Sequence, residues 1–106
     1  MSLSEEILKK WENLDAREVV DELIEKANIL TDLQGRPQGS IDGVFVYDLE
    51  TKKLMVVKES YNTFTPSFIY LYRLTAYDKA NVHEDDIYFD FIEKVQEKIQ
   101  NLKEEE

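Results

Sequence analysis

Two apolar runs, residues 41–47 and 53–58, constrain the fold of this chain more than any other feature. Both runs are rich in β-branched and aromatic residues, which favour strands. The polar stretch between them, residues 48–52, has the length of a hairpin connection. The pattern therefore predicts two antiparallel strands.

The first predicted strand carries apolar side chains on both of its faces. Val44 and Val46 share one face, whereas Phe45 and Tyr47 share the other. At least one face of the sheet must therefore be covered by helices.

A third strand is expected because a two-stranded hairpin is only marginally stable by itself. Residues 68–77 begin with an unbroken run of bulky side chains, residues 68–72, and are rich in strand formers. This composition favours a strand. Thr65 and Pro66 are also suitable for a helix start, so a helix over residues 66–78 stays open as the alternative.

Two amphipathic helices are predicted in the first 30 residues. The first covers residues 4–13, with Ser4 as its N-cap. The second follows Asp15, which forms a capping-box pattern with Glu18, and ends near Ile29.

The last predicted helix begins at the acidic residues 84–86, which suit the positive end of a helix dipole. Asp90 is placed to pair with Lys94 one turn later. Residues 103–106 put negative charge near the other end and are expected to fray. The apolar positions step by four and three residues: Tyr88, Ile92, Val95, Ile99 and Leu102.

These elements predict a single α+β domain over residues 1–106. Two N-terminal helices precede an antiparallel hairpin with a third strand, and the long C-terminal helix packs on the sheet. Residues 31–40 lack an apolar period and are predicted to be a loop. Residues 1–3 are interpreted as native or as a remnant of an expression vector.

Composition excludes several classes of function. The chain has no cysteine and one histidine, His83, and its three glycines form no phosphate-binding motif, so we expect no cofactor and do not favour enzymatic activity. The net charge of −10 disfavours nucleic-acid binding. No apolar run is long enough to span a membrane, and we expect a cytoplasmic protein without membrane attachment.

Three polar groups resemble sites but have simpler explanations. His83 and the acidic residues 84–86 are consecutive on a helix, so their side chains point about 100° apart and do not converge on one metal ion. Asp42 and Asp48 are candidates for acid–base catalysis, yet close carboxylates are expected by chance among 23 acidic residues. Arg36 is interpreted as an ordinary loop residue.

Aromatic residues carry the functional prediction, because nine of the twelve lie between residues 61 and 91. We expect the last helix to carry more apolar surface than so short a chain can bury, and the surplus to meet another protein. The predicted function is a non-catalytic protein–protein interaction module, most simply a homodimer. Its predicted interface comprises Tyr70, Tyr72, Tyr88, Phe89, Phe91, Ile92, Val95 and Ile99.

Two other functions remain open from the sequence. Acidic terminal helices are suited to a decoy or inhibitor of a basic, nucleic-acid-binding protein. Alternatively, a small ligand-binding domain or enzyme would use a tyrosine-lined pocket, in which Tyr70 or Tyr72 meets Arg73 and a carboxylate.

Overall fold

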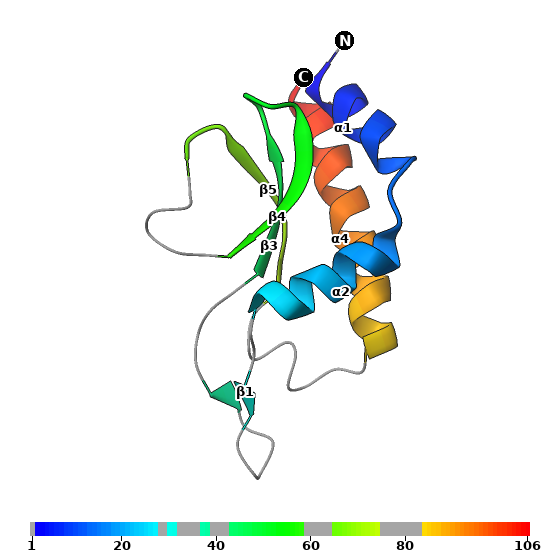
Figure 1. Ribbon diagram of the computed structural model, residues 1–106. Helices are drawn as coiled ribbons and strands as arrows, with labels where there is room; N and C mark the ends of the chain where they lie inside the picture. Colours follow the sequence, from blue (N-terminus) through cyan, green and yellow to red (C-terminus); the bar gives the residue numbers. More distant parts are fainter. Residues whose placement is uncertain (1, 28–29, 32–36, 39–42, 59–64, 75–83) are drawn as a thin grey trace.

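In the part of the chain that the structure describes, three helices pack on one side of a three-stranded antiparallel sheet, which confirms the predicted α+β class (Figure 1). The helices are α1 (Leu3–Trp11), α2 (Ala16–Ala27) and α4 (Glu84–Glu105). The computed structural model describes residues 2–27, 30–31, 37–38, 43–58, 65–74 and 84–106.

The sheet confirms the predicted hairpin and third strand. Strand β3 (Gly43–Asp48) lies between β4 (Lys53–Lys58) and β5 (Phe68–Leu74). β3 takes the central place because it pairs antiparallel with both neighbours.

The predicted loop at residues 31–40 is wrong for two short stretches. β1 (Leu30–Thr31) and β2 (Pro37–Gln38) pair antiparallel in a separate two-stranded ladder. Two-residue strands need backbone pairing but no apolar period, so the sequence pattern did not reveal them.

The Asp48 side chain organises the turn between β3 and β4. Its carboxylate accepts hydrogen bonds from the Glu50 N–H at 3.0 Å, the Thr51 hydroxyl at 2.9 Å and the Ser67 hydroxyl at 2.9 Å. Lys52 completes the turn with a φ of 60°, in the left-handed region. Asp48 therefore holds the turn to the start of β5.

A β-bulge shapes the third strand. Phe45 faces Tyr72 across the β3–β5 pair, whereas the next residue, Val46, faces Tyr70. Leu71 is the extra residue, and it lies in the hydrophobic core beside Tyr72. The bulge therefore lets two consecutive residues of one strand enter the core.

Helix α1 begins earlier than predicted and is held by the far end of the chain. Its N-cap is Ser2, whose hydroxyl accepts from the Glu5 N–H at 3.3 Å; the prediction of Ser4 is wrong. Ser4 is buried, and its N–H and hydroxyl donate to the Glu106 carboxylate at 2.8 and 2.9 Å. This carboxylate satisfies an unpaired N–H in the first helical turn.

The same contact changes the expectation for the acidic tail. Residues 103–105, which we expected to fray, are helical, and Glu106 follows directly. The hydrogen bonds from Ser4 hold the pKa of the Glu106 carboxyl below its usual range. A tertiary contact therefore offsets the unfavourable charge at this helix end.

Helix α2 starts as predicted, with the Asp15 carboxylate accepting from the N–H groups of Arg17 and Glu18. Its last described residue is Ala27; the predicted end at Ile29 lies outside the described residues. The helix packs on β3 and β4.

Helix α4 lies against β5, α1 and α2 and buries a row of residues spaced by four. Tyr88, Ile92 and Leu102 of the predicted apolar seam are only partly buried beside this row. The predicted pair of Asp90 with Lys94 is not formed, because Asp90 accepts a hydrogen bond from the Tyr72 hydroxyl at 3.1 Å. The buried row comprises Ile87, Phe91, Val95 and Ile99.

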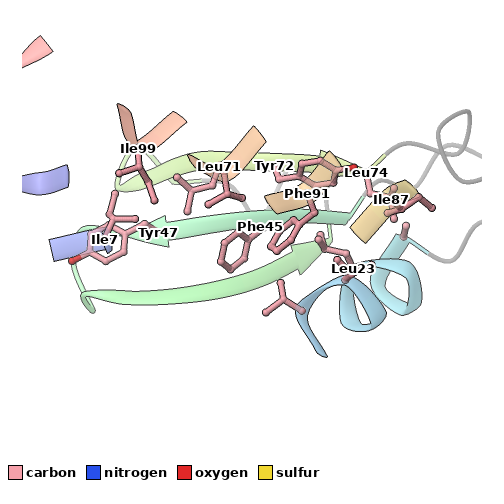
Figure 2. Close-up of a cluster of buried hydrophobic side chains, with 14 residues drawn as sticks. Ile7, Leu23, Phe45, Tyr47, Leu71, Tyr72, Leu74, Ile87, Phe91 and Ile99 are labelled. Atoms are coloured by element: carbon pink, nitrogen blue, oxygen red, sulfur yellow. The ribbon is translucent and has the colours of Figure 1, made fainter. Parts of the chain in front are cut away.

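The core lies between the helices and one face of the sheet (Figure 2). Phe91 is at its centre, with ring centroids 5.2 Å from Phe45, 5.3 Å from Tyr72 and 5.5 Å from Trp11. These tilted and edge-on contacts are the favourable arrangement for aromatic rings. One aromatic cluster thus joins α1, α4 and the sheet.

Candidate interaction surfaces

Half of the predicted interface belongs to the core of a single chain. Tyr72, Phe91, Val95 and Ile99 are all buried. A partner cannot reach these side chains while the subunit is folded. Their apolar character is accounted for by packing against the sheet and the neighbouring helices.

Two further predicted residues, Tyr88 and Ile92, are partly buried against the same core. The Arg17 guanidinium lies 4.6 Å from the centre of the Tyr88 ring and 3.5 Å from Asp85 Oδ1. Arg17 therefore connects the start of α2 to the start of α4 through a cation–π contact and an exposed ion pair.

Phe89 and Tyr70 are the predicted interface residues that remain well exposed, at 65% and 50%. Phe89 is on α4, and Tyr70 is on β5 opposite Val46. Because Val46 points away from the helices, the two exposed rings lie on different surfaces. The structure does not bring them together.

The face of the sheet turned away from the helices is also rich in apolar side chains. We call it the outer face, and among the described residues no helix covers it (Figure 1). Strand register places on it Val44 and Val46 of β3, Met55 and Val57 of β4, and Phe68 and Tyr70 of β5.

Burial differs across this face. Val44 and Val46 are almost completely buried in the central strand, whereas Met55, Val57 and Phe68 are half-buried and Tyr70 is exposed. The sequence signal for this surface was present, because strand alternation predicted apolar side chains on both faces of β3. Met55, Val57 and Phe68 were nevertheless missed as candidate residues.

The charge of the outer face differs from that of the whole chain. Among the described residues, its charged side chains are Asp48, Lys53 and Arg73, whereas the chain as a whole has a charge of −10. Burial acts to raise the pKa of the Asp48 carboxyl, but the hydrogen bonds from Glu50, Ser67 and Thr51 outweigh it and lower the pKa. Asp48 is thus a structural carboxylate, and its proposed catalytic partner Asp42 lies outside the described residues.

Among the described residues, the structure separates Tyr72 from Arg73. Tyr72 faces the helices and donates to Asp90, whereas Arg73 is opposite Val44 on the outer face. Tyr70 shares that face with Arg73. Strand register places one carboxylate there, that of Asp48, which already accepts hydrogen bonds within the turn and from Ser67.

The described residues show no group of three metal-ligating side chains. His83 lies outside the described part, and Asp85 and Asp86 are exposed. Over the ranges that the structure describes, no helix has both the length and the apolar composition needed to cross a membrane.

The chain matches no protein-family model, no curated protein and no solved structure.

Proposed function

We propose that the protein is a non-catalytic interaction module that self-associates through the outer face of its sheet. The observation that supports this most directly is the apolar composition of that face, on which Met55, Val57 and Phe68 are half-buried and Tyr70 is exposed, while the described helices lie against the opposite face. Contiguous apolar surface of this kind is typical of protein contacts.

Charge favours a second copy of the chain as the occupant. Two copies with a charge of −10 each repel one another when acidic surfaces approach. The described residues of the outer face include one carboxylate, already hydrogen-bonded within the turn, together with Lys53 and Arg73. Contact through this face keeps the acidic helices of the two copies apart.

The size of the face predicts a weak dimer. Three strands of about six residues cover about 14 by 20 Å, given a strand spacing of about 4.8 Å and a rise of about 3.3 Å per residue. A standard interface buries about 800 Å² per partner, which is more than this footprint provides. We therefore expect a dissociation constant of about 10–100 μM.

Sedimentation velocity over a concentration range from about 5 to 500 μM tests the proposal. Wild-type protein should show a sedimentation coefficient that rises with concentration. Tyr70→Glu should abolish the rise, because it places a charge within the contact. Phe89→Glu is the matched control, since it makes the same charge change at an exposed aromatic residue on α4.

The result that would overturn the proposal is a monomer throughout this range. Loss of association in Phe89→Glu but not in Tyr70→Glu would also contradict it and would place the contact on α4. Circular dichroism of each variant separates loss of association from loss of fold.

A second candidate function is supported by the exposed carboxylates of α2. Glu18, Asp21, Glu22 and Glu25 all face solvent, and such a row is suited to a basic partner. Affinity capture at low and high salt tests this function. A basic protein retained only at low salt would support it, and retention of the same proteins at both salt concentrations would contradict it.

A further inference from the structure

A lysine-lined cleft lies between α1 and the β3–β4 hairpin, on residues that the proposed dimer contact does not use. Its volume is about 360 Å³, which is within the range of small-molecule pockets. The residues that line it are Glu6, Lys9, Lys10, Asn13, Tyr47 and Lys52.

The cleft is locally positive on an acidic protein. Its lining includes three lysines and one carboxylate, that of Glu6. Glu6 Oε2 is 3.6 Å from Lys52 Nζ and accepts a hydrogen bond from the Tyr47 hydroxyl at 3.4 Å. Lys9 and Lys10 have no carboxylate within salt-bridge distance in the described part of the chain. Lys9 and Lys10 are therefore not held in ion pairs with any described residue.

The hairpin side of the cleft is held in place before any ligand binds. The Lys52 N–H donates to the Asp48 carbonyl at 2.8 Å, and the Asp48 carboxylate fixes the rest of the turn. Tyr47 is completely buried except where its hydroxyl reaches Glu6. A preformed arrangement lowers the entropy cost of binding.

The mixture of groups indicates the chemistry of the ligand. Lysine ammonium groups bind phosphate as point charges, and the charge of a phosphate monoester, about −1.5 to −2 at pH 7, favours it over a single carboxylate. The Glu6 carboxylate accepts hydrogen bonds, as a ligand hydroxyl would require.

We propose that this cleft binds a hydroxyl-bearing phosphate monoester, with the phosphate bound by Lys9, Lys10 and Lys52 and a hydroxyl bound by Glu6. Neither dimerisation nor the outer face is required for this binding. Contacts with exposed lysines are individually weak, so we expect a dissociation constant of about 1 mM.

The test is a titration of the ¹⁵N-labelled full chain, followed by amide chemical shifts. The probes are glycerol 3-phosphate and inorganic phosphate, with glycerol and sodium chloride at matched ionic strength as controls. Saturable shifts at residues of the cleft are expected with both phosphates, and glycerol 3-phosphate should bind more tightly. Shifts that do not saturate, or that sodium chloride reproduces, would overturn the proposal.

Charge variants distinguish a site from a general electrostatic effect. Lys52→Gln should weaken phosphate binding about fivefold to tenfold. Lys94→Gln on α4 is its matched control, because the two side chains are 55% and 54% exposed and each has one ion pair, at 3.6 and 3.7 Å. An equal loss in both variants would overturn the proposal.

The role of Glu6 has its own test. Glu6→Gln removes a negative charge from the cleft, so inorganic phosphate should bind more tightly to this variant. The advantage of glycerol 3-phosphate over inorganic phosphate should decrease. An unchanged advantage would show that Glu6 does not bind the hydroxyl and would overturn that part of the proposal.

Discussion

Replacing Gly43 by alanine should destabilise the protein because α2 passes very close to the start of β3. A Cβ atom at this position would lie 2.7 Å from the Leu23 carbonyl oxygen and 3.2 Å from the Ala27 nitrogen. Both atoms belong to the backbone of α2, so no side-chain rotation relieves the contact. The helix has to move away from the sheet.

Two effects of opposite sign determine the magnitude. Overpacking a well-packed core costs about 1–3 kcal/mol. Alanine also restricts the unfolded chain, which stabilises the folded protein by about 0.4–1 kcal/mol. Because the nearest obstacle at Gly43 is a backbone atom closer than 3.0 Å, we expect the steric cost to prevail. The expected net loss is about 1–2 kcal/mol in the free energy of unfolding.

Urea denaturation followed by Trp11 fluorescence and by circular dichroism measures this loss. Trp11 is the single tryptophan, and its ring lies 5.5 Å from that of Phe91, so it reports on the core. The double variant Gly43→Ala with Ala27→Gly is the control. It removes only the side-chain contact at 3.5 Å and leaves both backbone contacts, so stability should not recover.

A Gly43→Ala variant as stable as the wild type would refute the close approach of α2 to β3. Recovery in the double variant would show instead that the Ala27 methyl group was the obstacle.

Three further perturbations test the core and the two polar contacts of the hairpin. Phe91→Ala should lower the free energy of unfolding by about 3–5 kcal/mol in the same urea assay, because it empties the centre of the aromatic cluster; a loss below about 1 kcal/mol would contradict that packing. Asp48→Asn should lower the urea midpoint at neutral pH, and the difference from wild type should shrink in acid, since the stability linked to a lowered carboxyl pKa is lost as pH falls through the folded-state value. A difference that persists undiminished in acid would exclude the linkage. Burial and the neighbouring Glu6 raise the pKa of Tyr47 in the folded protein. As pH rises above about 10, the Tyr47 hydroxyl therefore ionises first in the unfolded state. Tyr47→Phe should therefore lose less stability than wild type between about pH 9 and 11, as measured by urea midpoints; parallel pH profiles would argue against this assignment.

The sequence determined the local elements of this protein because their signals are short in range. Strand formers around residues 48–52 produced the hairpin, and the Asp15 cap began α2. The third strand also followed from local preference, as the continuous bulky residues from Phe68 onward favoured it. Each of these features depends on neighbours within a few positions.

Tertiary structure decided which apolar residues are covered. Much of the predicted surplus on the last helix is absorbed by the core, because the buried row follows Ile87, Phe91, Val95 and Ile99 where α4 meets β5 and α1. Tyr88, Ile92 and Leu102 are partly buried, and Phe89 is exposed. The bulge at Leu71 and the contact between Ser4 and Glu106 also required partners far away in the sequence. The spacing of apolar residues predicts that a helix has an apolar side, but only packing determines how much of that side another element covers.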